Sequence, residues 1–86
     1  MRLDERSSAA PAVAGWHDQL YLAWTGSDRH VNLLTLAVDG PDPVSGEKTR
    51  FEEATSHHGP AVCSHQGGLV VAWSGTDHRL NVAHLR

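Results

Sequence analysis

Short apolar runs alternate with polar turns along this chain of 86 residues. Residues 20–24 read Leu-Tyr-Leu-Ala-Trp, and residues 69–73 repeat them as Leu-Val-Val-Ala-Trp. Nearly continuous apolar runs of this length, rich in β-branched and aromatic residues, are typical of strands that are buried on both faces. The chain shows no run with the 3.6-residue apolar period of a helix. The pattern therefore predicts an all-β protein.

The two runs belong to a longer internal repeat. Residues 49 positions apart match in type: Leu20 and Leu69, Ala23 and Ala72, Trp24 and Trp73, Gly26 and Gly75, Asp28 and Asp77, and Asn32 and Asn81. Repeats of this period are typical of propeller blades, solenoid units or arrays.

Each copy predicts strands joined by tight turns. A small-residue strand (residues 10–14 and 59–63) is followed by a Gly-, Asp- and Gln-containing turn, the apolar strand, a second turn and a third strand (residues 31–36 and 80–85). The first copy alone continues, through a loop rich in Gly, Pro and Asp, to a fourth strand around residues 49–53. Four short strands per repeat favour two four-stranded β-propeller blades. A small β-sandwich is the alternative, although it gives no reason for the repeat.

We interpret residues 1–49 as an N-terminal strand plus the first blade, and residues 50–86 as a second blade whose last strand is missing. Two blades cannot close a ring, and they would leave apolar faces and strand edges uncovered. The strand expected at residues 3–6 has no blade of its own. We expect it to complete the last blade of another copy, head to tail, so that a homo-oligomer closes the ring. A trimer would give six blades. A fragment of a longer propeller, or an engineered chain, is the alternative.

The repeat resembles a known family. Ser56, Gly59-Pro60-Ala61-Val62, the run from Gly68 to Asp77, and Leu80-Asn81-Val82 are similar to the blade repeat of bacterial sialidase-like and lectin-like propellers. The resemblance implies a propeller fold. Its function is left open, because propellers of this pattern include carbohydrate-binding lectins, glycosidases and other proteins.

Composition and charge exclude some classes of partner and location. The net charge is −3 and Lys and Arg form no cluster, which argues against a nucleic-acid partner. No apolar run is long enough for a transmembrane helix, and the N-terminal residues lack a signal-peptide core, so the chain as written is expected in the cytoplasm. The histidines lack zinc-ligand spacing, and we expect no metal or cofactor. Cys63 is expected to be a buried small apolar residue.

Candidate ligand-binding residues lie in turns and at repeated positions. Trp16, in a turn, is the best candidate for stacking on a sugar ring. Further candidates are Trp24, Trp73, Arg29, Arg79, Asn32 and Asn81. The two strand tryptophans equally suit packing between blades, and the asparagines suit hydrogen bonding to the backbone. No constellation of acids, bases and nucleophiles is evident.

The functional hypothesis is a non-enzymatic, carbohydrate-binding module. The alternatives are a propeller scaffold without a small ligand and an inactive fragment of a sialidase-like glycosidase.

Overall fold

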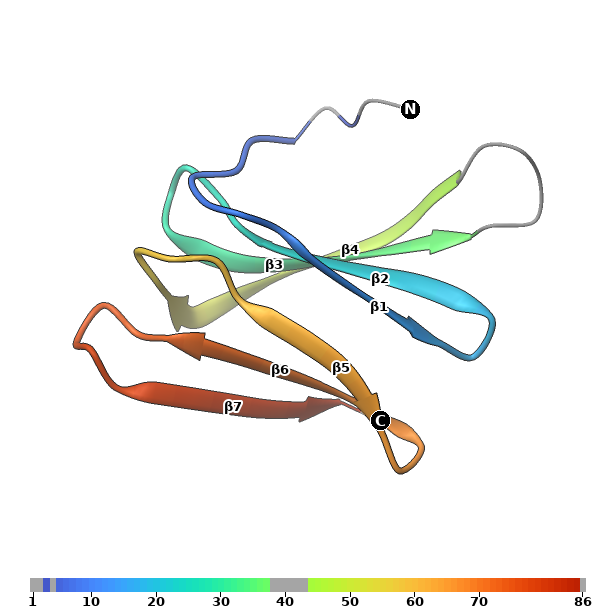
Figure 1. The fold of residues 1–86 in the computed structure, drawn as a ribbon. Coiled ribbons are helices and arrows are strands. Elements are labelled where there is room, and N and C mark those ends of the chain that lie inside the picture. The colour runs from blue at the N-terminus through green and yellow to red at the C-terminus, as the bar shows by residue number, and fades with distance from the viewer. Residues whose placement is uncertain (1–2, 4, 38–43, 86) are drawn as a thin grey trace.

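A computed structural model describes residue 3, residues 5–37 and residues 44–85 of the chain. These residues form seven strands and no helix, which confirms the all-β prediction. They build two antiparallel sheets, each with its strands in chain order (Figure 1). The first sheet contains β1 (Ala12–Trp16), β2 (Gln19–Thr25), β3 (His30–Ala37) and β4 (Val44–Thr55); the second contains β5 (Ala61–His65), β6 (Gly68–Ser74) and β7 (Leu80–Leu85).

β4 is longer than expected. Its twelve residues pair with β3 through two register shifts, one between His30 and Asn32 and one between Leu34 and Leu36. Such bulges let a long strand bend along a shorter partner. The repeat boundary drawn between residues 49 and 50 lies inside this strand.

The strand expected at the N-terminus does not form within this chain. Residue 3 and residues 5–8, which we call the N-terminal segment, have no strand assignment. A strand needs an edge to pair with. The edge strands of the first sheet are β1 and β4, whereas Leu3 packs on a face of that sheet, against Trp24, Leu34 and Leu36.

Successive side chains of each strand point to opposite sides of the sheet, so each sheet has two faces. One face, here called the tryptophan face, carries the large apolar residues: Val13, Leu20, Leu22, Trp24, Leu34 and Leu36 in the first sheet, and Val62, Leu69, Val71, Trp73, Ala83 and Leu85 in the second. The other, the alanine face, carries smaller residues over most of its area: Ala12, Ala14, Ala23, Val31 and Leu33 in the first sheet, and Ala61, Cys63, Ala72, Leu80 and Val82 in the second. At one end of the first sheet this face also carries Trp16 and Tyr21, which pack against the cluster of Ala23, Leu33 and Leu69.

The core lies between unlike faces. The tryptophan face of the second sheet packs on the alanine face of the first, where Leu69 joins Ala23 and Leu33 in one cluster, and Val71 joins Val31 in another. The first strands of the two sheets, β1 and β5, contact each other along this junction (Figure 1). Phe51 from β4 contributes to both clusters. The two sheets therefore stack head to tail, as two copies of one unit.

The other two faces have no sheet against them. On the first sheet, Leu3 packs on the tryptophan face beside Trp24, Leu34 and Leu36, while Val13 stays 58% exposed.

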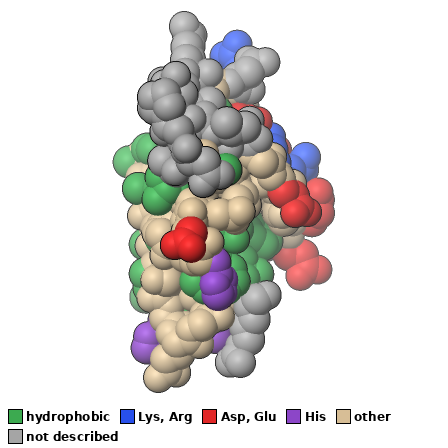
Figure 2. All heavy atoms as spheres, turned by 90° about the vertical axis from the view of Figure 1, so that its right-hand side faces the viewer, with side chains coloured by type: hydrophobic (Ala, Val, Ile, Leu, Met, Phe, Trp, Pro, Cys, Tyr) green, Lys and Arg blue, Asp and Glu red, His purple; other side chains and the backbone are tan. Residues whose placement is uncertain are grey.

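On the second sheet, the alanine face is open. Leu80 is 85% exposed and Val82 is 69% exposed. Cys63 is also exposed, so the expectation that it is buried is wrong for the single chain, because nothing among the described residues covers this face. In side view, hydrophobic side chains accordingly reach the surface, and acidic side chains gather along one margin (Figure 2).

Candidate functional site

The β1–β2 hairpin presents the aromatic residues that the sequence singled out. His17 and Asp18 form its two-residue turn, with φ of 53° and 60°. Positive φ at both central residues is the geometry of a type I′ turn, whose twist matches that of the flanking strands. Asp tolerates this conformation better than most residues. The turn places Trp16 at the end of β1, directly opposite Gln19.

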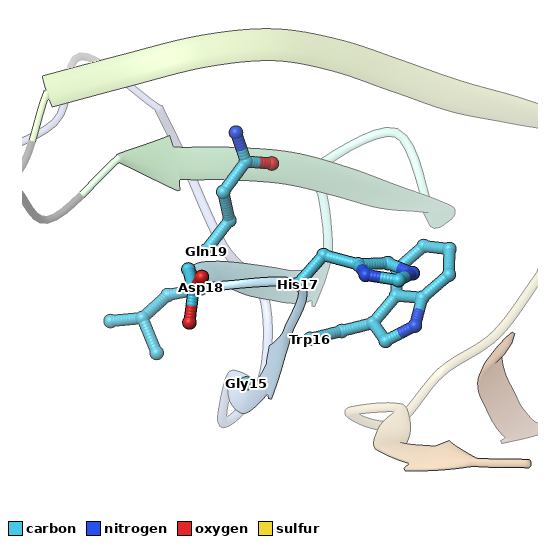
Figure 3. Close-up of a pocket in the computed structure, with 6 residues that line it drawn as sticks. Gly15, Trp16, His17, Asp18 and Gln19 are labelled. Atoms are coloured by element: carbon cyan, nitrogen blue, oxygen red, sulfur yellow. The ribbon is translucent and has the colours of Figure 1, made fainter. Parts of the chain in front are cut away.

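Three rings meet at this hairpin. The Trp16 ring lies 4.5 Å from the His17 ring and 5.5 Å from the Tyr21 ring, centroid to centroid, at tilted angles. Figure 3 shows the Trp16 and His17 rings together on one side of the turn, with Asp18 and Gln19 pointing away from them. The Tyr21 hydroxyl lies 3.4 Å from the Gln19 Oε1. Sequence reasoning found Trp16 but missed Tyr21, although a two-residue turn already brings position 21 to the same face.

A shallow cavity of about 470 Å³ adjoins these rings and is lined by Gly15, Trp16, His17, Asp18, Gln19 and Leu20. The Trp16 Nε1 is buried without a hydrogen-bond partner among the described residues. An unsatisfied buried donor costs about 1–3 kcal/mol. Aromatic faces beside a carboxylate and an amide form a surface suited to a ligand with both C–H and O–H groups.

The second repeat has the same hairpin without the aromatic rings. Gln66 and Gly67 take φ of 47° and 75°, so the turn type is repeated. His65 stands where the first copy has Trp16, and Val70 stands where it has Tyr21. The three-ring cluster is therefore a property of the first sheet alone.

The repeated Gly, Asp and Asn brace the second turn of each copy. The Asp28 Oδ1 accepts a hydrogen bond from the His30 backbone N–H at 3.1 Å, and the Asn32 Nδ2 donates to the His30 carbonyl at 2.9 Å. In the second copy, Asp77 accepts from the Arg79 N–H at 3.1 Å, and Asn81 donates to the Arg79 carbonyl at 2.9 Å. The polar groups of the two asparagines are thus engaged with the backbone.

Glycine is required in this turn because the two polar side chains fill the space beside it. A Cβ on Gly26 would lie 2.9 Å from the Asp28 Oδ1 and 3.1 Å from the Asn32 Nδ2. On Gly75 the corresponding distances, to Asp77 and Asn81, are 2.8 and 2.9 Å. The shared Gly-x-Asp pattern is accounted for by this local packing.

The two strand tryptophans are largely packed. Trp24 is 3% exposed, and the Lys48 ammonium lies 5.7 Å from the centre of its ring. Trp73 is half-buried and packs with Phe51 and Leu85 around Val71. Packing accounts for both positions.

The two candidate arginines lie in the braced turns, one position apart in the repeat. Arg29 is exposed with φ of 69°, and its guanidinium contacts the His57 Nδ1. His78, not Arg79, takes the equivalent conformation, with φ of 68°. The structure therefore brings Arg29 and Arg79 into different environments and does not gather them with Trp16.

A polar cavity lies beside each strand tryptophan. The first, about 360 Å³, is lined by Glu5, Arg6, Trp24, Gly26, Ser27, Asp28, Asn32, Lys48 and Arg50. The second, about 180 Å³, is lined by Glu53, Thr55, Trp73, Gly75, Thr76, Asp77 and Asn81. Six of these positions are equivalent in the repeat, and four of the six carry the same residue type in both copies. The cavities are equivalent places in the two copies, between the turn and the segment that crosses it.

The first cavity is lined by charged groups of both signs, whereas the charged groups that line the second are carboxylates. Lys48 pairs with Glu5 at 2.7 Å, and Arg50 pairs with Asp28 at 3.4 Å. The lining of the second cavity includes Glu53 and Asp77 and no Lys or Arg.

The Asp28 carboxyl has a perturbed pKa. The hydrogen bond from the His30 backbone N–H holds this pKa below its ordinary value of 3.8, and the nearby Arg50 charge lowers it further. Asp28 is therefore ionised at neutral pH and acts as a fixed acceptor in its turn.

Within the described part of the chain, no three or more His, Cys, Asp or Glu residues are grouped so that they could hold a metal ion. The same residues include no helix with the length and apolar character to cross a membrane. No family model, curated protein or solved structure matches the chain.

Proposed function

We propose that the chain is a non-enzymatic β-propeller module, in which each sheet is one blade and several copies close a ring. The observation that carries this proposal is the head-to-tail packing of unlike faces. One tryptophan face already packs on one alanine face within the chain. The remaining pair of faces has the same types of side chain and lies free of any sheet.

The exposed apolar faces favour blades over a sandwich. A β-sandwich buries its two inner faces and turns polar residues outward. Here the outward face of the first sheet carries the half-buried Leu20 and Leu22 and the exposed Val13, and that of the second carries the exposed Leu80 and Val82. Burying one Leu or Val fully is worth about 1.5–3 kcal/mol, so these faces favour association.

The native mass in solution tests the ring. We expect light scattering to give about three times the 9.3 kDa mass of one chain. Leu80→Asp places a charge on the open alanine face and should shift the mass to that of the monomer. Gln66→Asp adds the same charge at an exposed hairpin turn and should leave the oligomer intact. A monomeric wild-type chain would remove the ring proposal.

The ring would bind carbohydrate, and the β1–β2 hairpin is its best site. The Trp16 and His17 rings line its cavity together with Asp18 and Gln19, so apolar faces and polar groups border the same hollow. Tyr21 supports the Trp16 ring from the neighbouring strand. The Trp16 N–H is buried and takes no part in the proposed contact. Repetition of such a weak site around a ring would strengthen binding through multivalency.

A glycan array followed by calorimetry tests the carbohydrate part. We expect Trp16→Ala to abolish binding and Tyr21→Phe, which keeps the ring, to retain most of it. Circular dichroism of both variants controls for folding. Absence of any sugar binding at millimolar concentration would remove the lectin proposal.

A propeller scaffold without a small ligand is the second candidate. It is favoured by the braced turns, because the repeated Asp28, Asn32, Asp77 and Asn81 are engaged with their own backbone. Under this alternative the oligomer forms and the glycan array stays empty.

A further inference from the structure

The N-terminal segment sits on the first sheet as the end of β4 sits on the second. Leu3 packs on the tryptophan face of the first sheet beside Trp24, and Phe51 packs on that of the second beside Trp73. Glu5 and Arg6 line the first polar cavity, and Glu53 and Thr55 line the second.

The N-terminal segment and β4 are followed by the same hydrogen-bonded turn. The Ser7 hydroxyl donates to the Ala9 carbonyl at 2.5 Å, and the Ser56 hydroxyl donates to the His58 carbonyl at 3.0 Å. Ser7 and Ser56 are equivalent in the repeat, as are the two acceptors. The two segments therefore occupy equivalent places, each crossing one tryptophan face and then entering the first strand of that sheet.

The end of β4 crosses the tryptophan face of the second sheet, and β4 is at the same time the fourth strand of the first sheet. By the same relation, the N-terminal segment lies where the fourth strand of a preceding sheet would lie. Among the described residues, its one backbone hydrogen bond to a strand runs from the Ser8 N–H to the carbonyl of Thr25, the last residue of β2, at 2.9 Å. It forms no strand ladder with any described strand. The segment thus has the position of a fourth strand, and the described residues contain no sheet to which that strand would belong.

The second sheet, in turn, is short of a fourth strand among the described residues. Its last strand, β7, is an edge strand, and no fourth strand follows it among the described residues. Equivalent side chains on the third strands accordingly differ in exposure: Val31 on β3 is 0% exposed, while Leu80 on β7 is 85% exposed.

We infer that the N-terminal segment of one copy adds to the free edge of β7 in a second copy as its fourth strand. In this contact, the tryptophan face of the first copy covers the alanine face of the second. The inference rests on the proposed function and specifies its interface: the partner is a second copy of this chain, and each contact reproduces one that already exists between the two sheets.

The repeat fixes the register. His30 on β3 lies opposite Thr55 on β4, and the Ser56 N–H donates to the Arg29 carbonyl at 2.9 Å. The equivalent positions place Arg6 of one copy opposite Arg79 of the other, with the Ser7 N–H directed at the His78 carbonyl.

This register places two like charges opposite each other, because residues 6 and 79 are both arginines. Like charges directly opposite across a strand pair are destabilising. The contact between the two faces and the backbone hydrogen bonds of the added strand therefore have to outweigh this repulsion.

Disulfide trapping between two variants tests the register. Both variants carry Cys63→Ala, which restores the residue type of the equivalent Ala14; one adds Arg6→Cys and the other Arg79→Cys. Directly opposed residues of antiparallel strands lie about 4.5–5.5 Å apart, within the range of a disulfide. After mixing and mild oxidation, peptide mass spectrometry should find residue 6 joined to residue 79.

A matched control replaces Arg79→Cys with Gln66→Cys, an exposed position at the opposite end of the second sheet. We expect no link between residues 6 and 66. Absence of the 6–79 link, or equal linking at both positions, would overturn the strand addition.

The native mass separates this failure from that of the proposed function. An oligomer without the 6–79 link would be consistent with the proposed ring and would contradict the strand addition. A monomer would remove both, and the free edge of β7 would then be covered by something other than a second copy.

The unaltered chain provides a second measurement. Cys63 lies exposed on the alanine face of the second sheet, and the inferred contact buries it. We expect its reaction with a thiol reagent to be slow at high protein concentration and to speed up on dilution. Fast labelling of the intact oligomer would contradict the inferred face contact.

Discussion

The two sheets are built from one repeated pattern, but their equivalent side chains differ sharply in burial. Val31 is 0% exposed and its counterpart Leu80 is 85% exposed; Leu33 is 8% exposed and its counterpart Val82 is 69% exposed. The strands that carry them have the same turns and the same pairing with the preceding strand. The difference therefore comes from the neighbours of each strand: Val31 packs against Val71 of the second sheet and Ala54 of β4, whereas β7 has neither a covering sheet nor a fourth strand among the described residues.

The tryptophan faces show the reverse difference over part of their area. Leu69 and Val71 of the second sheet are fully buried by the first sheet, while the counterparts Leu20 and Leu22 are only half-buried. Trp24 of the first sheet is nevertheless buried, at 3% exposed, because Leu3, and not a second sheet, packs on it. Among the described residues, each sheet thus has one face covered by the other sheet and one face that is not, and the uncovered faces are of opposite kinds. This asymmetry is what head-to-tail association would resolve.

The largest expected effect comes from the junction between the sheets. Leu69→Ala removes a fully buried side chain and should lower the free energy of unfolding by about 2–5 kcal/mol. The equivalent change Leu20→Ala should cost clearly less in the monomer, because Leu20 lies on the uncovered side. Chemical denaturation of both variants, at a concentration where the chain is monomeric, measures the difference.

The Leu69→Ala and Leu20→Ala variants also test whether association covers the tryptophan face of the first sheet. At concentrations where copies associate, the contact would cover Leu20, and the cost of Leu20→Ala should rise toward that of Leu69→Ala. Equal costs in the dissociated chain would show that the two faces are equally packed and would contradict the asymmetry.

The turns were predictable because their chemistry is local. Gly26, Asp28 and Asn32 lie within seven positions, and the structure shows that they contact one another and the backbone between them. The all-β class, the order of the described strands and the packing roles of Trp24 and Trp73 could also be predicted, since they follow from apolar runs and from the repeat.

The sequence could not predict which copy of a repeated residue is buried. Cys63 and Ala14 have the same place in their sheets, yet Cys63 is exposed because no sheet covers its face. The Trp16 cluster was also only partly accessible, since Tyr21 joins it through the strand register. Both features depend on residues that are distant in sequence or on another molecule.

A medium-sized effect should be the same in both copies. Gly26→Ala and Gly75→Ala each force a Cβ into the space of the bracing Asp and Asn side chains. Loss of one such hydrogen bond costs about 0.5–1.5 kcal/mol. Because the turns are local and alike, the two variants should lose similar stability in thermal or chemical unfolding. A large difference would mean that the second turn depends on the contacts around it, as the faces do.

The smallest expected effect concerns the charge of Asp28. Its pKa in the folded chain lies below the ordinary value of 3.8, first because of the His30 N–H and then because of Arg50. The stabilisation from this ionised carboxylate is therefore present above the unfolded-state pKa and is lost as pH falls through the lower, folded-state pKa.

Asp28→Asn keeps an acceptor oxygen for the His30 N–H but does not titrate. Unfolding curves measured between about pH 6 and pH 2 should then show the wild type losing its small advantage over Asp28→Asn in the acidic part of the range. Arg50→Gln separates the two causes, since it removes the nearby charge and leaves the backbone hydrogen bond, and it should reduce that advantage without abolishing it. Parallel profiles for the wild type and Asp28→Asn would show that the turn is held by its geometry alone and would contradict a contribution from the charge of Asp28.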